Sequence, residues 1–211
     1  SMSRIPLLVS VDGEWGPSMR YSEFPFFPRQ MQLGALTSDS LVYQMGLAIA
    51  EQCKMVNLHI NFAPVVDINT NPKNPVIHTR SFGENKERVT KFASAYMRGM
   101  QDGGIYASAK HFPGHGDTDV DSHRSLPILP FSRERLDSLE LYPFKSLIDE
   151  DVAMVMIGHL FIPSLDTIVS TLSHKVVTKL HKEEMKFDGI VVTDALNMKG
   201  VSSTLRPSEV T

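Results

Sequence analysis

The amino-acid sequence predicts an α/β fold of the (β/α)8, or TIM barrel, type, truncated over this length. Short apolar runs alternate with amphipathic helical stretches, which is typical of a parallel sheet covered by helices. No glycine-rich phosphate loop follows any of these runs, whereas such loops mark many doubly wound sheets. Polar residues instead gather where the runs end, and barrel enzymes build their sites there. A smaller open sheet is the alternative.

Five apolar runs are expected to form the strands. They rarely alternate with polar residues, the pattern of strands buried on both faces. The expected strands are residues 5–11, 58–66, 105–109, 152–157 and 189–193. The polar residues at their C-terminal ends are Asp12, Asp67, Lys110, His111, His159 and Asp194. A whole barrel has eight strands and about 250 residues, so we expect residues 1–211 to form one domain that is incomplete at both ends.

The first expected helix begins near Asp39, because Ser38 and Asp39 are good helix-capping residues. Residues at helical spacing place one apolar stripe on it. This stripe is expected to contain Leu41, Met45, Ala48 and Ile49. It is interpreted as core packing, the usual role of such stripes.

Three more helices are expected between the later strands. The second covers about 85–101, with an apolar stripe of Val89, Phe92, Ala93, Tyr96 and Met100. The third follows Ser132 and is interrupted or restarted at Pro143, because proline lacks the backbone N–H that a helix interior uses. The fourth covers about 174–185.

Composition excludes several classes of protein. The chain has 211 residues, of which 42% are hydrophobic and 21% charged, a balance that favours a folded core over disorder. The net charge of −3 argues against a nucleic-acid partner. The single cysteine, Cys53, cannot form an internal disulfide. No apolar run approaches the about 20 residues of a membrane-spanning helix.

Residues 110–123 form the densest cluster of ionisable side chains, directly after the third expected strand. One interpretation is a metal site, because His111, His115, Asp119 and His123 are suitable ligands for zinc or a similar ion. A second is structural, with polar loop side chains bonding their own backbone. The density of ionisable groups favours a functional role over the structural one.

A third interpretation of the same segment is acid–base catalysis. Asp121 and His123 are two residues apart, so their side chains project to the same side of an extended loop. A carboxylate that accepts from one imidazole nitrogen fixes the tautomer and raises the basicity of the other. The pair is therefore a candidate proton-transfer group.

Asp194 ends the last expected strand. An ionised carboxylate is costly at the end of a buried apolar strand unless it is paired or used. Capping the segment that follows is one role for it. At the C-terminal end of a barrel strand, it is also well placed as a nucleophile.

Two more segments add binding groups to the same rim. Asp12 ends the first strand and Arg20 follows eight residues later, while Arg80 lies in the segment after the second strand. Together with Lys110 and His111 they suit a ligand with many hydroxyl groups, because carboxylates and cations grip hydroxyls by charge-assisted hydrogen bonds.

These segments resemble a known family. Residues 110–123 (KHFPGHGDTDVDSH) closely resemble the signature of glycoside hydrolase family 3, and more narrowly its bacterial β-N-acetylglucosaminidase branch. Residues 61–83 (NFAPVVDINTNPKNPVIHTRSFG) and 188–198 (DGIVVTDALNM) match the same branch in the same order. The resemblance implies a (β/α)8 barrel, a retaining mechanism, and neither cofactor nor metal.

The resemblance also implies roles for single residues. Asp194 falls on the catalytic nucleophile, His123 on the acid/base histidine of this branch, and Asp121 on its dyad partner. The residues that fall on those holding the N-acetylglucosamine are Asp12, Arg20, Arg80, Lys110 and His111.

The chain departs from the pattern of the branch next to two of these residues. Gly13 and Trp15 stand in the loop after the first strand where the branch usually has a glutamine and a glycine. Ala195 and Asn197 replace acidic residues common beside the nucleophile.

The leading hypothesis is hydrolysis of terminal β-linked N-acetylglucosamine, with peptidoglycan-derived sugars as the natural substrate class. One alternative is a metal-dependent barrel hydrolase that uses His111, His115, an aspartate and His123. The other is a protein that binds sugar without turning it over. Neither a nucleic-acid partner nor a membrane-spanning segment is expected.

Overall fold

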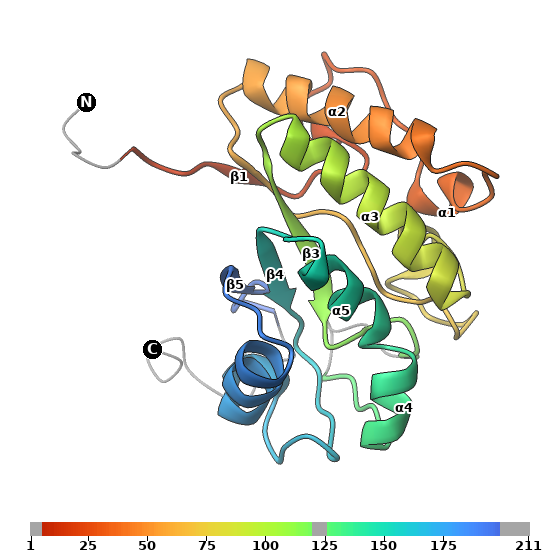
Figure 1. Cartoon of the computed structure of the whole chain (residues 1–211), viewed down its shortest axis with the longest axis vertical. Coiled ribbons are helices and arrows are strands. Elements are labelled where there is room, and N and C mark those ends of the chain that lie inside the picture. Colours follow the sequence, from red (N-terminus) through yellow and green to blue (C-terminus); the bar gives the residue numbers. More distant parts are fainter. Residues whose placement is uncertain (1–5, 120–125, 199–211) are drawn as a thin grey trace.

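The computed structural model describes residues 6–119 and 126–198. Within them, five parallel strands form one sheet whose spatial order follows the sequence, β1-β2-β3-β4-β5 (Figure 1). The strands are β1 (Ser10–Val11), β2 (Ile60–Asn61), β3 (Tyr106–Phe112), β4 (Met154–Ile157) and β5 (Ile190–Thr193). Each lies within or overlaps one of the expected runs.

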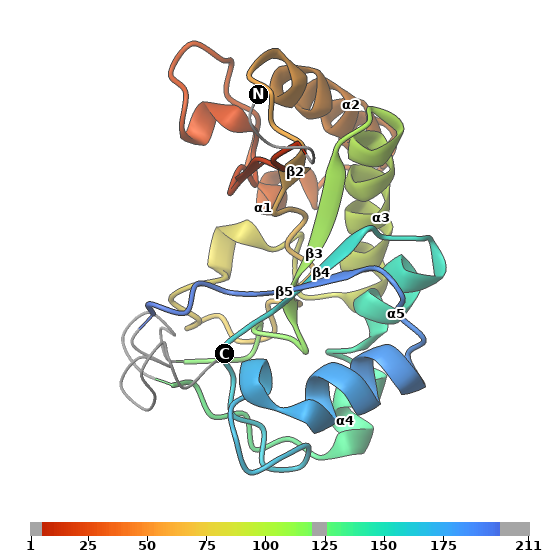
Figure 2. The ribbon, with the colours of Figure 1, turned by 90° about the vertical axis from the view of Figure 1, so that its left-hand side faces the viewer.

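The strand order separates the two expected architectures. A doubly wound sheet reverses its strand order at a switch point, and the described strands show no such reversal. Right-handed crossovers between successive neighbours bring every connecting helix to the same face. Figure 2 shows α2, α3 and α5 together on one side of the sheet. The sheet is therefore a curled part of a barrel, with helices outside.

The described helices occupy the connections between the strands. They are α1 (Gln30–Leu33), α2 (Ser40–Met55), α3 (Lys86–Asp102), α4 (Arg133–Ser138), α5 (Tyr142–Asp149) and η4 (Lys175–Glu184). Three short 3-10 turns are η1 (Pro17–Met19), η2 (His78–Arg80) and η3 (Ser170–Leu172). None of the described helices is both long and apolar enough to cross a membrane.

The strands β1 and β2 are much shorter than the apolar runs predict. At β1, the backbone N–H of Val9 donates to the His59 imidazole at 3.1 Å instead of joining a strand ladder. In the second run, regular pairing ends after Asn61, and Pro64 further along has no N–H to donate. Val65 then forms a single bridge to Lys110. The polar residues after these strands consequently lie on loops.

The helix boundaries follow local sequence signals. The Asn85 side chain accepts from Arg88 N at 2.8 Å and caps α3, and Ser132 caps α4 in the same way. Pro143 stands in the first turn of α5, so the predicted restart there is confirmed. At α2 the Asp39 side chain makes no capping bond, whereas Ser38 Oγ accepts from Ser40 N at 3.2 Å.

The predicted apolar stripe of the first helix was wrong at its first residue. Leu41 is 62% exposed, and Val42 is fully buried in its place. The buried face of α2 packs on α3 through close contact between Gly46 and the second helix. A Cβ added at Gly46 would lie 2.6 Å from the Tyr96 carbonyl oxygen. The two helix backbones thus approach one another, which turns Leu41 outward.

This contact gives a test of the helix packing. Gly46→Ala is expected to lower the free energy of unfolding by about 1–3 kcal/mol, because backbone atoms must move to admit the methyl group. Urea denaturation followed by circular dichroism measures it. The matched control is Gln44→Ala on the exposed face of the same helix, which is expected to change stability by less than about 0.5 kcal/mol. Equal effects of the two substitutions would contradict the close approach.

Candidate active site

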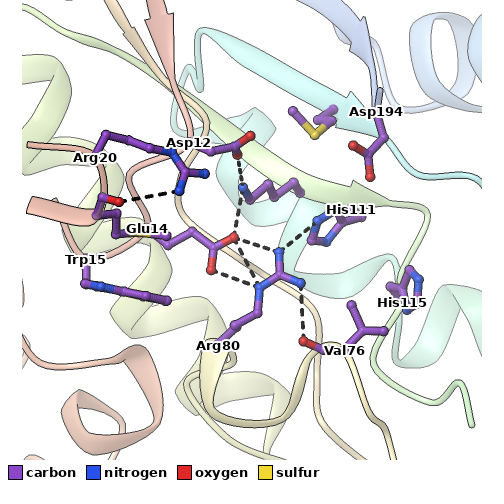
Figure 3. A pocket seen from close by; sticks show the side chains of 12 residues that line it. Asp12, Glu14, Trp15, Arg20, Val76, Arg80, His111, His115 and Asp194 are labelled. Atoms are coloured by element: carbon purple, nitrogen blue, oxygen red, sulfur yellow. Dashed lines mark hydrogen bonds and ion pairs between the residues drawn. The ribbon is translucent and has the colours of Figure 1, made fainter. Parts of the chain in front are cut away.

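The C-terminal ends of the strands surround a pocket of about 240 Å³ (Figure 3). Its walls come from the loops after β1 and β2, from β3 and the loop after it, from β4, and from the residue after β5. The residues that line it are Asp12, Glu14, Trp15, Met19, Arg20, Val76, Arg80, Lys110, His111, His115, Met156 and Asp194. The structure therefore brings together seven of the candidate site residues named from the sequence: Asp12, Arg20, Arg80, Lys110, His111, His115 and Asp194.

A buried glutamate forms the floor of this pocket. The Glu14 carboxylate is 4% exposed and pairs with Arg80 Nη2 at 2.7 Å and Lys110 Nζ at 2.9 Å. Burial alone raises the pKa of Glu14, but the Lys110 ammonium and the Arg80 guanidinium outweigh it and hold the pKa well below its usual range. The glutamate is thus ionised and fixes both cations at the pocket wall.

Lys110 links this buried pair to an open carboxylate. Its side chain comes from β3 and is itself buried, while its ammonium also donates to Asp12 Oδ1 at 2.8 Å. The Asp12 side chain is 50% exposed. Asp12 therefore presents acceptor oxygens to the pocket. Its carboxylate is held in position by the buried Lys110 ammonium.

The loop that carries Glu14 is held by side chains from two other elements. Asn61 on β2 makes two hydrogen bonds to the backbone of Gly13, at 3.0 and 2.9 Å. The Tyr96 hydroxyl reaches from α3 and donates to the Glu14 carbonyl at 3.0 Å. Because Tyr96 and Asn61 are fully buried, the position of Glu14 is set by the core.

Asp67, after β2, organises the histidines of the next loop. Its carboxylate accepts from His111 Nδ1 at 2.7 Å, from the His111 backbone N–H at 3.2 Å and from the His115 backbone N–H at 2.7 Å. Burial by itself raises the pKa of Asp67, but the His111 imidazole and these donors bring the pKa below its ordinary value. The start of the segment 110–123 is thereby anchored.

The tautomer of His111 follows from its two partners. Its protonated Nδ1 donates a hydrogen bond to Asp67, and its Nε2 lies 3.2 Å from Arg80 Nη2. A guanidinium can only donate, so Nε2 accepts. Both ring nitrogens are engaged, which leaves no lone pair of His111 for the predicted metal alternative. His111 lines the pocket and positions Arg80 beside it.

The neighbouring His115 is neutral near pH 7. Burial, and then the nearby His111, lower the pKa of its imidazole to about 4. Its Nδ1 lies 2.9 Å from the Thr118 hydroxyl. Within residues 6–119 and 126–198, no group of three or more His, Cys, Asp or Glu side chains is arranged to hold a metal ion.

Asp194 stands where β5 ends. Its backbone N–H donates to the Ile157 carbonyl at 2.9 Å, and its Oδ1 accepts from Ala195 N at 2.7 Å. Burial alone raises the pKa of Asp194, but His111, the Ala195 N–H, His159 and Lys110 together lower it. The carboxylate is thus ionised and faces the pocket from the side opposite Trp15 (Figure 3).

His159, after β4, holds the turn at Asp194. Its Nε2 lies 3.0 Å from the Ala195 carbonyl oxygen, which can only accept, and its Nδ1 lies 3.0 Å from the Thr171 hydroxyl. Nε2 is therefore protonated and donates to this carbonyl, while Nδ1 is hydrogen-bonded to the Thr171 hydroxyl. The ring orients the peptide that follows Asp194.

Arg20, Asp121 and His123 are the other site residues predicted from the sequence. Arg20 lines the pocket, and its Nη1 donates weakly to the Met19 carbonyl at 3.4 Å. Asp121 and His123 lie outside the described residues, so their proposed pairing stays a prediction. The sequence patterns predict Asp67 and His159 only as polar strand ends and do not predict a role for Glu14. The signal for Glu14 is its spacing of two from Asp12 directly after a strand.

Comparisons with known proteins identify the family of this chain. The family model "Glycosyl hydrolase family 3 N terminal domain" matches residues 1–211. The chain is 35% identical to Beta-hexosaminidase A of Pseudoalteromonas piscicida, covering 100% of this chain and 38% of that protein. It is 29% identical to a Beta-hexosaminidase of Nitrosospira multiformis, covering 97% of this chain and 60% of that protein.

The fold has a solved counterpart. The structure of a glycoside hydrolase family 3 beta-N-acetylglucosaminidase from Paenibacillus sp. str. FPU-7 matches with a TM-score of 0.92 and 42% sequence identity. The match covers 95% of this chain and 39% of that protein. This likeness confirms the predicted barrel-type fold. The chain spans between 38% and 60% of the length of these three relatives.

The buried cluster predicts how stability depends on pH. Glu14→Gln is expected to destabilise the chain at pH 7 by about 3–5 kcal/mol, because it leaves Lys110 buried without its inner carboxylate. Since the pKa of Glu14 is lowered by folding, its contribution is present above the ordinary pKa of about 4.3 and is lost as the pH falls further. The difference between the two proteins should therefore narrow at pH 3.

Urea denaturation at pH 7 and pH 3 measures this difference. Glu51→Gln, on the exposed surface of α2, serves as the matched control and is expected to behave like the unmodified chain. A stability difference that stays constant between the two pH values would contradict the lowered pKa of Glu14.

Proposed function

The chain belongs to glycosyl hydrolase family 3, and from this premise we propose that it is a retaining glycoside hydrolase that releases terminal β-linked N-acetylglucosamine. The observation that carries the proposal is the pocket in which an ionised Asp194 faces a fixed set of charged donors and acceptors. Relatives of this chain are named beta-hexosaminidase and beta-N-acetylglucosaminidase, which supports N-acetylglucosamine as the sugar.

The pocket suits one sugar ring. Its volume of about 240 Å³ lies below the about 300–1,000 Å³ of pockets that hold drug-sized ligands. Asp12 offers carboxylate oxygens to sugar hydroxyls, and Arg80 and Lys110 offer N–H donors from fixed positions. Charge-assisted hydrogen bonds of this kind are stronger than neutral ones, so the cluster would orient the ring before reaction.

The first half of the proposed reaction uses Asp194 as nucleophile. Its carboxylate attacks the anomeric carbon, the bond from that carbon to the leaving oxygen breaks, and a glycosyl ester of Asp194 forms. The lowered pKa of Asp194 keeps its carboxylate ionised for this attack. The leaving oxygen takes a proton from His123, a role that rests on the family resemblance of residues 110–123.

The second half reverses the proton transfer. A water molecule gives a proton to His123 and attacks the same carbon, which releases the sugar and restores the Asp194 carboxylate. Asp121 would hold the His123 imidazole in the required tautomer. The anchoring of residues 111–115 by Asp67 gives this segment a fixed starting point. Peptidoglycan-derived sugars remain the natural substrate class that we propose.

A trapping experiment tests the nucleophile. A mechanism-based fluorinated N-acetylglucosamine donor is expected to add one sugar to the protein, detected by intact-mass spectrometry and mapped to Asp194. Asp194→Asn should stay unlabelled, because an amide is a poor nucleophile. Asp188→Asn, six residues earlier and exposed, is the matched control and should be labelled normally. Circular dichroism verifies that all three proteins are folded.

The label also separates the proposal from a protein that only binds sugar. A folded chain that binds N-acetylglucosamine yet never acquires the label would overturn the covalent mechanism. A label on a residue other than Asp194 would overturn the assignment of the nucleophile while leaving the retaining mechanism in place.

A chelator separates the proposal from metal-dependent hydrolysis. Because both nitrogens of His111 are engaged by Asp67 and Arg80, we expect turnover of a nitrophenyl N-acetyl-β-glucosaminide to be unchanged after incubation with EDTA and gel filtration. Loss of activity that added zinc restores would favour the metal-dependent alternative.

A further inference from the structure

Trp15 lies between two pockets. It lines the 240 Å³ pocket with Asp194, and it also lines a second pocket of about 550 Å³. The other residues of the second pocket are Phe26, Phe27, Arg29, Met31, Gln32 and Thr79. Trp15 is the one residue that the two linings share.

The indole ring is held in place from the side of the second pocket. The Arg29 guanidinium lies over the ring, 4.6 Å from its centroid, a favourable cation–π contact. Arg29 Nη1 in turn donates to the Thr79 hydroxyl at 2.9 Å. Thr79 precedes Arg80 in the turn η2. The stack of Arg29 on Trp15 is thus hydrogen-bonded to the turn that carries Arg80, a residue of the first pocket.

The backbone beside Trp15 fixes it as well. Gly16 has a φ of 97°, in the left-handed region that favours glycine. A Cβ at this residue would lie 3.1 Å from the Phe27 ring. On the other side of Trp15, Glu14 is buried in its ion pairs. The backbone on both sides of Trp15 is therefore fixed, and Arg29 contacts the ring from the second pocket.

The ring stands at the far end of the pocket from the nucleophile. Figure 3 shows Asp194 and Trp15 at opposite ends, with Glu14 and Arg80 between them. If Asp194 attacks the anomeric carbon, the opposite, non-reducing end of the sugar points toward Trp15. A further sugar attached at that end would have to occupy the volume that the indole fills.

We propose that Trp15 is a specificity-determining residue that closes the sugar pocket at its non-reducing end and so restricts cleavage to a single terminal sugar. The inference rests on the proposed function. Removing the indole joins the first pocket to the second, whose aromatic and methionine side chains offer apolar surface to the face of another pyranose ring. The enlarged site accepts a second β-linked sugar at the non-reducing end.

The experiment compares two donors, a nitrophenyl N-acetyl-β-glucosaminide and the nitrophenyl glycoside of the β-linked disaccharide of N-acetylglucosamine. In the unmodified protein, the disaccharide donor should lose one sugar before any nitrophenol appears. Trp15→Ala is expected to release nitrophenol together with intact disaccharide, seen by mass spectrometry. The ratio of kcat/KM for nitrophenol release from the disaccharide to that from the monosaccharide should rise by at least about tenfold, the lower end of what pocket shape yields.

Two further variants complete the test. Trp15→Phe keeps a ring in the same place and should retain most of the single-sugar preference. Phe26→Ala alters the second pocket without touching the first and should leave the ratio unchanged. Thermal unfolding reports whether each variant folds, and Trp15→Leu replaces Trp15→Ala if the alanine variant does not.

Each outcome decides a separate point. A monosaccharide donor that is cleaved with an unchanged ratio in the folded Trp15→Ala or Trp15→Leu variant overturns the role of Trp15 and leaves the proposed function standing. Intact disaccharide released by the unmodified protein also overturns it. No cleavage of either donor by any of the folded proteins overturns the proposed function and this inference with it.

Discussion

The pairing of Glu14 with Lys110 and Arg80 is the interaction on which the site depends. The two cations come from different elements of the barrel, Lys110 from the strand β3 and Arg80 from the turn η2 before α3, and each pairs with the same carboxylate. Burying such charges costs several kcal/mol per ion unless partners satisfy them. Their mutual pairing meets this requirement within the protein, so the donors keep their positions in the absence of a ligand.

Asp67 likewise fixes His111 and the backbone of His115 through buried hydrogen bonds. It fixes His111, and His111 accepts from Arg80, so the carboxylates of two separate loops are connected through one imidazole and one guanidinium. The field of this network reaches Asp194, whose pKa is lowered in part by His111 and Lys110. A site that is already oriented does not have to reorganise as charge develops during reaction, which is where much of the stabilisation of a transition state arises.

The fold and most of the pocket could be predicted from the sequence because both follow from short-range patterns. Apolar runs located all five described strands, and the residues at their ends, such as Asp12 and Asp194, meet because parallel strands end on the same side of a barrel. Leu41 was misplaced because the packing angle of α2 depends on Gly46 meeting Tyr96, a contact between helices that no local pattern records. Glu14 was missed for the same reason, since its partners lie 66 and 96 residues away, at Arg80 and Lys110.

Glu14 and Asp12 lie in the same loop but differ in role: Glu14 holds the buried cations, whereas Asp12 is open to a ligand. The two carboxylates share Lys110, yet Glu14 is closed in by Arg80 and the core while Asp12 keeps half of its side chain open. A hydroxyl that approaches Asp12 meets an acceptor whose counter-ion is already fixed, so binding replaces water at one carboxylate without breaking the buried pair. Trp15 follows directly in the same loop, and one short segment thereby supplies the floor, an acceptor and the end wall of the pocket.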